Sequence, residues 1–180
     1  RAAGIMVVVS AGNDGPSCRT VDTPPANYDA SFSVGATNNS GVVTGFSSRG
    51  PVDGLLKPDI AAPGSDVRSS LPGSGYGVAS GTSMAGPHVA GVVALLWSAD
   101  RALIGDIEAT EALLCETAEP QPVDKSCAIA DNPPTNPLLS EALSTPACAC
   151  GNVTGTPNNV YGCGNINAGA AVNAALGLEE

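Results

Sequence analysis

The stretch Ser80-Gly81-Thr82-Ser83-Met84-Ala85-Gly86-Pro87-His88-Val89-Ala90-Gly91 decides the fold of this chain. A loop of small residues leads directly into an apolar run that continues to Trp97, and this pattern predicts a helix that is buried on most sides. Pro87 fits the first turn of such a helix, where a missing backbone N–H removes no intrahelical hydrogen bond. Ser83 then lies where unpaired N–H groups and the helix dipole favour a developing negative charge.

Taken alone, a serine at this place also suits an ordinary capped core helix. The ordered string Gly81-Thr82-Ser83-Met84-Ala85, followed by Pro87-His88-Val89-Ala90-Gly91, resembles the active-serine motif of the subtilisin-like serine proteases. The resemblance implies that Ser83 is the catalytic nucleophile and that Thr82 supports the oxyanion hole. It also implies an α/β fold, a three-layer sandwich with a mostly parallel sheet. The chain, residues 1–180, is then the carboxyl-terminal part of one catalytic domain, and the fold is incomplete.

A second segment near the amino end carries the same resemblance. Ile5–Val9 is a short continuous apolar run, which predicts a strand buried on both faces of a parallel sheet. A turn sequence follows at the carboxyl end of that strand, where open α/β sheets bind ligands. Asn13 is an ordinary turn residue on local pattern alone. The run Val8–Asn13, however, resembles the subtilase segment whose Asn side chain completes the oxyanion hole. The same resemblance implies that backbone at three residues lines the pocket for the residue before the cleaved bond: Ser10, Ala11 and Gly12.

A serine nucleophile needs a general base, usually a histidine held by a carboxylate. The chain has one histidine, His88, which follows Ser83 on the same helix and is predicted to be a packed residue that cannot reach the serine hydroxyl. In the subtilisin order the acid and the histidine precede the serine, yet residues 1–82 contain no histidine. The α/β-hydrolase order is excluded as well, because no histidine follows residue 88. Asp59 is predicted to order a loop or strand end, not to act as the triad acid.

Three explanations for the absent base stay open: one part of a cleaved or incomplete protease, a truncated product that keeps half the fold, or a non-catalytic binding or assembly module. We expect this chain alone to hydrolyse no peptide at an appreciable rate. An isolated half-sheet exposes a strand edge and apolar faces. We therefore expect the missing amino-terminal half of the domain, or a second copy of this chain, to cover that surface. A polypeptide is the expected substrate.

The composition indicates a packed globular protein and argues against binding to nucleic acid or to a membrane. The 180 residues are 43% apolar and 3% aromatic, a mixture that fits a tightly packed α/β protein with a real core. Seventeen Asp and Glu against seven Lys and Arg give a net charge of −10. Because no basic cluster exists, nucleic-acid binding is not expected. No run approaches the roughly 18 apolar residues of a membrane span, so no membrane contact is expected either.

The six cysteines predict disulfide bonds and an oxidising, extracellular compartment, with the pairing left open. Cys148 and Cys150 are too close for the usual zinc pair and have no histidine nearby, which argues against a metal. Residues 118–160 are rich in Pro, Asn, Thr and Cys and too long for an ordinary connection, so they predict a disulfide-stapled insertion. No cofactor is expected. The family resemblance allows for calcium, but no carboxylates have a calcium-loop spacing, and no ligand is assigned.

Local patterns predict the remaining elements. The predicted strands lie at 31–36, within 56–64, and at 67–71 and 76–79, the last two around a Pro72-Gly73 turn. An amphipathic helix is predicted at 107–117, a last helix at 168–176, and one helical turn at 138–143 within the insertion.

Overall fold

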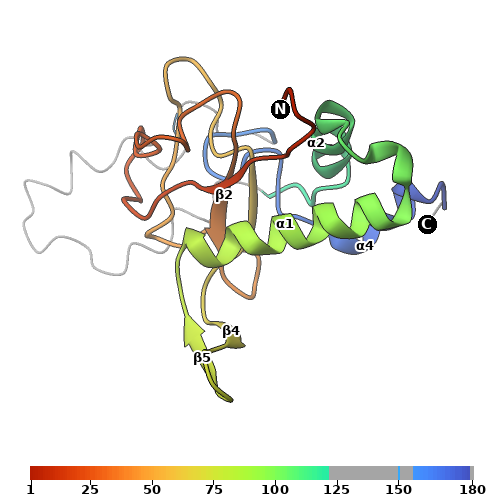
Figure 1. The fold of residues 1–180 in the computed structure, drawn as a ribbon. Helices are drawn as coiled ribbons and strands as arrows, with labels where there is room; N and C mark the ends of the chain where they lie inside the picture. The colour runs from red at the N-terminus through yellow and green to blue at the C-terminus, as the bar shows by residue number, and fades with distance from the viewer. Residues whose placement is uncertain (122–149, 151–155, 179–180) are drawn as a thin grey trace, which may run out of the picture.

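The computed structural model describes residues 1–121, 150 and 156–178 (Figure 1). Its elements follow in the order β1 (Val8–Ser10), β2 (Phe32–Thr37), β3 (Ile60–Pro63), β4 (Val67–Ser70), β5 (Tyr76–Ala79), α1 (Thr82–Ala99), the 3-10 helix η1 (Arg101–Leu103), α2 (Ile107–Glu116) and α4 (Ala168–Ala175). The predicted turn at 138–143 and most of the predicted insertion lie outside the described residues. No helix in the described ranges is both long and apolar enough to cross a bilayer.

A parallel sheet in the order β1-β2-β3 forms the centre of the fold. Its side chains alternate between two faces, as the pleat requires. One face of the sheet packs against buried residues of α1 in the main core. The sheet side chains on this face are Phe32, Val34, Ala36, Ile60 and Ala62. On the other face, Ala61 joins a second cluster with Val43, Val160 and Tyr161, which come from loops. Helices therefore cover one face and loops the other, which confirms the predicted incomplete α/β sandwich.

The first predicted strand is shorter and more exposed than expected. β1 begins at Val8, and the exposed fractions of Ile5 and Val7 are 63% and 40%. β1 pairs with β2 on one side, and within the described residues it has no strand on the other. The prediction of burial on both faces was therefore wrong for the start of this run, because the side chains there have only one layer to pack against.

Helix α1 lies along the sheet and is open on its other side (Figure 1). Its buried residues include Val89, Val92, Val93 and Leu96, which face the sheet core. Leu95, by contrast, is 53% exposed. The prediction that α1 is buried on most sides was therefore wrong. The described chain supplies a layer to only one side of a helix whose residues are apolar all round.

The helix that follows is well capped and covalently anchored. The Asp106 carboxylate accepts the Ala109 backbone N–H at 3.0 Å, which satisfies one of the unpaired donors at the start of α2. A disulfide joins Cys115 of α2 to Cys163. A second disulfide, Cys18–Cys150, spans 132 residues. These bonds confirm the predicted disulfides for four of the six cysteines; Cys127 and Cys148 lie outside the described residues.

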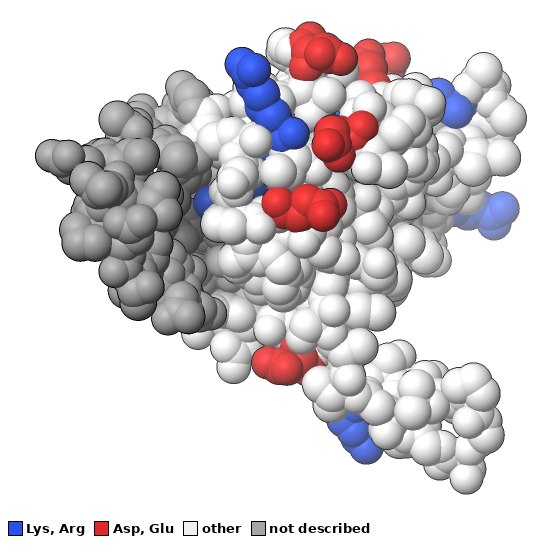
Figure 2. All heavy atoms as spheres, turned by 90° about the vertical axis from the view of Figure 1, so that its left-hand side faces the viewer, with Lys and Arg blue, Asp and Glu red and all other residues white. Residues whose placement is uncertain are grey.

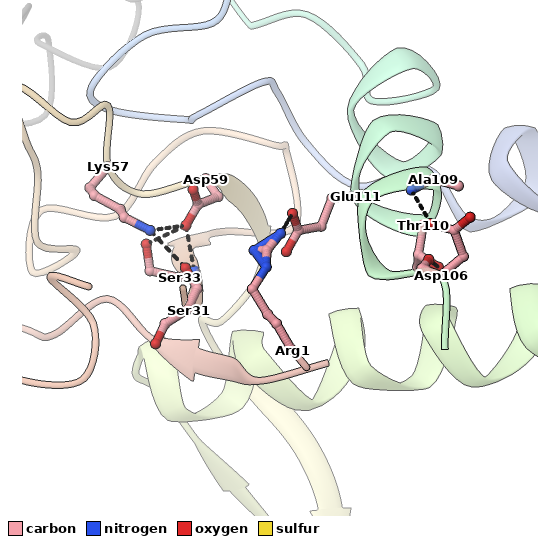
Figure 3. A network of polar contacts seen from close by, with 9 residues as sticks. All are labelled: Arg1, Ser31, Ser33, Lys57, Asp59, Asp106, Ala109, Thr110 and Glu111. Atoms are coloured by element: carbon pink, nitrogen blue, oxygen red, sulfur yellow. Dashed lines mark hydrogen bonds and ion pairs between the residues drawn. The ribbon is translucent and has the colours of Figure 1, made fainter. Parts of the chain in front are cut away.

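A polar cluster fixes the beginning of β3 (Figure 3). Asp59 Oδ2 accepts hydrogen bonds from the Ser33 backbone N–H at 2.6 Å, the Ser33 hydroxyl at 2.8 Å and the buried Lys57 ammonium at 2.7 Å. Lys57 also donates to the Ser31 carbonyl at 2.7 Å. Asp59 therefore orders the start of a strand, as predicted, at the end of the sheet opposite the start of α1.

Candidate active site

The start of α1 is held against the carboxyl ends of β2 and β3. The Gly81 N–H donates to the carbonyl of Gly64, just after β3, at 2.7 Å. A Cβ at Gly64 would lie 2.6 Å from the Cβ of Ala36 and 2.9 Å from the Gly81 carbonyl oxygen, so only glycine permits this approach. Ser83, the second residue of α1, is exposed on the first turn.

The side chain of Asn13 is oriented by the same turn. Its Oδ1 accepts the Thr82 backbone N–H at 2.9 Å and lies 3.1 Å from the Thr82 hydroxyl. A backbone N–H can only donate, so the amide oxygen must face the helix and Nδ2 must face away. Among the described residues Nδ2 has no acceptor. The Nδ2 group of Asn13 is thus left as a donor without an acceptor among the described residues, on a side chain that binds Thr82, the residue before Ser83.

Thr82 also locks the loop after β1. Its buried hydroxyl accepts the Gly12 N–H at 3.2 Å. Gly12 has φ +109°, and a Cβ there would lie 2.8 Å from Ser48 Oγ, so any other residue would be strained and crowded. Ser48 in turn accepts the Asp14 N–H through Oγ at 3.1 Å and donates its own N–H to the Gly12 carbonyl at 3.0 Å. The loop is therefore clamped on both sides of Asn13.

The three residues before Asn13 run from the sheet to this clamp. Ala11 is buried, and its N–H donates to the Val34 carbonyl at 3.0 Å. Ser10 ends β1 and faces α1, since a Cβ at Gly86 would lie 3.8 Å from Ser10 Oγ. The structure thus brings the segment 10–13 to Thr82, which directly precedes Ser83 in α1.

His88 lies on the open side of α1. Its Nδ1 is 2.8 Å from the carbonyl of Met84 in its own helix, and the residue is exposed. The prediction of a packed histidine was therefore wrong, because the described chain leaves only an open hollow on this side of α1. No hydrogen bond joins His88 to Ser83 in the described structure, in keeping with its predicted inability to serve as the base.

Comparison with known proteins places the chain in a family. The model of the subtilase family matches residues 1–164. The chain belongs to the subtilase family. It is 38% identical over 179 residues to bacillopeptidase F of Bacillus subtilis (strain 168), covering 97% of this chain and 10% of that protein. It is 45% identical over 98 residues to subtilisin E of the same organism, covering 54% of this chain and 24% of that protein.

Solved structures give the same result for the fold. The patellamide maturation protease PatA superposes with a TM-score of 0.68 at 27% identity, covering 99% of this chain and 54% of that one. The prenylagaramide maturation protease PagA superposes with a TM-score of 0.64 at 26% identity, covering 97% and 52%. This subtilase chain therefore spans about half of each matched structure and smaller shares of the curated relatives.

Acidic, histidine and cysteine side chains do not form a metal cluster among the described residues. No three His, Cys, Asp or Glu side chains in the described ranges gather closely enough to hold a metal ion. A hollow of about 640 Å³ at the start of β2 and β3 is lined by several separate carboxylates, among them Glu111. Burial raises the pKa of Glu111, and the guanidinium of Arg1 that contacts it acts in the opposite sense. This hollow lies at the end of the sheet opposite Ser83.

Sequence reasoning missed one charged residue beside the serine. A hollow of about 290 Å³ between α1 and β4 is lined by Ser83, Met84, Pro87, His88, Val67, Arg68 and Ser69. The local pattern predicts Arg68 only as part of a short strand. The sequence feature that could have drawn attention to Arg68 is that it is the only cationic residue between Lys57 and the active-serine motif.

Proposed function

We propose that this subtilase chain supplies the nucleophile and the oxyanion-binding groups of a serine endopeptidase. The observation that supports the proposal is the Thr82 N–H bond to Asn13 Oδ1, which ties the Asn13 amide to the residue before Ser83 and leaves Nδ2 available as a donor. In the proposed reaction Ser83 Oγ attacks the scissile carbonyl carbon. The oxygen then gains negative charge and is bound by Asn13 Nδ2 and the Ser83 backbone N–H. The amine leaves with a proton, and water hydrolyses the acyl-enzyme.

The neighbouring residues have supporting roles in this proposal. Thr82 holds the amide of Asn13 from behind. The backbone of Ser10, Ala11 and Gly12 lines the pocket for the residue before the cleaved bond. The chemistry uses protein groups alone.

The base is proposed to come from outside this chain. Ile5 and Val7, just before β1, and Leu95, on the side of α1 away from the core, expose large apolar side chains. Exposed apolar side chains on both elements favour a covering layer. We propose that the amino-terminal half of a subtilase domain, carrying the histidine and its carboxylate, covers them, with a second copy of this chain as the alternative occupant. The two disulfides favour an oxidising, extracellular setting for the assembled protein.

The test compares the 180-residue chain with the protein that has its upstream sequence restored. We expect the restored protein to cleave an internally quenched peptide and to react with a serine-directed fluorophosphonate probe, and the chain alone to do neither. Ser83→Ala should abolish both signals. Ser98→Ala is the matched control, because Ser98 is an exposed serine of the same helix whose hydroxyl bonds to the Ala94 carbonyl at 2.7 Å; it should retain full activity.

A second candidate function is a non-catalytic binding or assembly module, which is favoured by the absence of a usable histidine. It predicts that Ser83→Ala changes nothing, even in the restored protein. Unchanged peptide cleavage by that variant would refute Ser83 as the nucleophile. Steady Ser83-dependent cleavage by the 180-residue chain alone would refute the need for an outside base.

A further inference from the structure

The hollow beside Ser83 is distinct from the pocket proposed at the end of β1. The Asn13 side chain reaches the helix start through Thr82, before Ser83 in the chain. The hollow is built from residues after Ser83, namely Met84, Pro87 and His88, and from β4 across from them. In Figure 1 the β4–β5 hairpin leaves α1 on the side away from β2. A substrate bound at Ser83 can therefore place a second side chain in this hollow.

Arg68 gives the hollow its charge. It lies on β4 opposite Val78 of β5, and its guanidinium carbon is 4.1 Å from the centroid of the Tyr76 ring. Stacking on an aromatic face orients a guanidinium while its N–H groups stay free at the edges. Figure 2 shows basic and acidic atoms where the hairpin leaves the body of the molecule.

The guanidinium of Arg68 is not neutralised within the described residues. The ion pairs found there are Arg1–Glu111 and Lys57–Asp59, and neither involves Arg68. Asp66, two residues away, lies 3.3 Å from the Ser65 hydroxyl and forms no ion pair with Arg68. His88, the other titratable side chain of the hollow, adds no negative charge. In a chain of net charge −10, the β4 side of the hollow therefore carries a cation that forms no ion pair with the residues the structure describes.

We propose that this hollow binds the carboxylate side chain of an Asp or Glu in the polypeptide substrate, with Arg68 as the residue that selects it. The proposal rests on the proposed protease function. A free guanidinium fork pairs with a carboxylate through two parallel N–H···O bonds. Tyr76 is the positioning residue, because its ring stacks on the guanidinium of Arg68, which lines the hollow.

The test uses the restored protein and amidated, internally quenched peptides, so that no terminal carboxylate competes. Glu, Gln or Lys is placed in turn at each position near the cleaved bond, which mass spectrometry identifies. We expect kcat/KM to be about three- to tenfold higher with Glu than with Gln at one position. Arg68→Gln should bring this ratio to about one, and Arg68→Glu should favour Lys at the same position. Arg101→Gln, which changes an exposed arginine of η1, is the control and should leave the ratio unchanged.

A binding measurement tests this inference independently of the proposed protease function. Fluorescence anisotropy with the Ser83→Ala protein measures whether the Glu peptide binds more tightly than the Gln peptide, without any cleavage. An Arg68-dependent preference in binding supports the inference even if no peptide is cleaved. Equal treatment of Glu and Gln at every position, or a preference that survives Arg68→Gln, would overturn it. Tyr76→Ala should weaken the preference and Tyr76→Phe should keep it, since both rings can stack but alanine cannot.

Discussion

Replacing Thr82 with valine tests how the site is organised, because the change removes one hydroxyl and keeps the side-chain shape. Thr82 is fully buried, so no water substitutes freely for the lost group. The Gly12 N–H loses its acceptor at 3.2 Å, and an unpaired donor of this kind costs about 1–3 kcal/mol. Gly12 is only partly buried, so we expect the free energy of unfolding to fall by the lower part of that range, about 1–2 kcal/mol.

The same change should lower activity for a separate reason. Asn13 Oδ1 keeps the Thr82 backbone N–H at 2.9 Å but loses the hydroxyl at 3.1 Å. One hydrogen bond of this type contributes about 0.5–1.5 kcal/mol, which corresponds to about a two- to tenfold fall in kcat for a donor that acts in the transition state. KM should change little, because the oxyanion exists only after attack.

The assays are urea titration of the restored protein and steady-state cleavage of a quenched peptide. Thr82→Ser is the matched control: it keeps the hydroxyl and loses the methyl group, so it should retain kcat while losing some stability. If Thr82→Val leaves kcat unchanged, or if Thr82→Ser lowers kcat as much, the hydroxyl does not orient Asn13 and the reasoning fails.

Three further predictions concern stability. Lys57→Met leaves the Asp59 carboxylate without its cation in a largely buried site, so the free energy of unfolding in urea should fall by about 3 kcal/mol. Adding Asp59→Asn should recover part of this loss, because the uncompensated charge is then removed. An unchanged urea midpoint for Lys57→Met would contradict the prediction. Replacing both Cys115 and Cys163 with alanine removes a cross-link spanning 48 residues, which on the chain-entropy relation destabilises by about 4 kcal/mol; a calorimetric Tm equal to that of the oxidised protein would argue against it. Burial raises the folded-state pKa of Glu111 above its ordinary value of 4.5, so the folded protein binds more protons than the unfolded chain between pH 4.5 and the raised pKa. The unfavourable contribution of this carboxylate to stability is therefore absent below that window and complete above it. Glu111→Gln should therefore be more stable relative to the parent at about pH 7 than at about pH 4, and urea titrations at both values check the sign.

Local patterns were sufficient for most of the secondary structure. The predicted strand at 31–36 corresponds to β2, and the two strands around Pro72-Gly73 correspond to β4 and β5. The predicted helices at 107–117 and 168–176 end within one residue of α2 and α4. These elements are encoded by neighbouring residues through apolar spacing and turn formers. The short helix η1 was not predicted, and its Asp100 cap is the local signal that could have indicated it.

The candidate site depended on contacts that no local pattern contains. Asn13 was recognisable as a turn residue, and only the family resemblance gave it a role. The physical reason for its orientation is the Thr82 N–H, 69 residues further along the chain. The cysteine pairings have the same character, since the Cys18–Cys150 bond spans 132 residues and spacing left the pairs open. Arg68 was missed because its importance comes from lying opposite Ser83 across a hollow, not from its neighbours in the sequence.

The exposed side of α1 connects stability to the proposed chemistry. Leu95 and Leu96 are chemically identical neighbours, yet their exposed fractions are 53% and 0%. A helix that is apolar all round is typical of a layer between two others, and the described chain supplies only one of them. Fully burying a leucine side chain contributes about 1.5–3 kcal/mol, so a covering layer over Leu95 and Ile5 gains stability from side chains that now face water. Under the proposed function, the half-domain that covers these side chains would also bring the general base that Ser83 lacks in this chain.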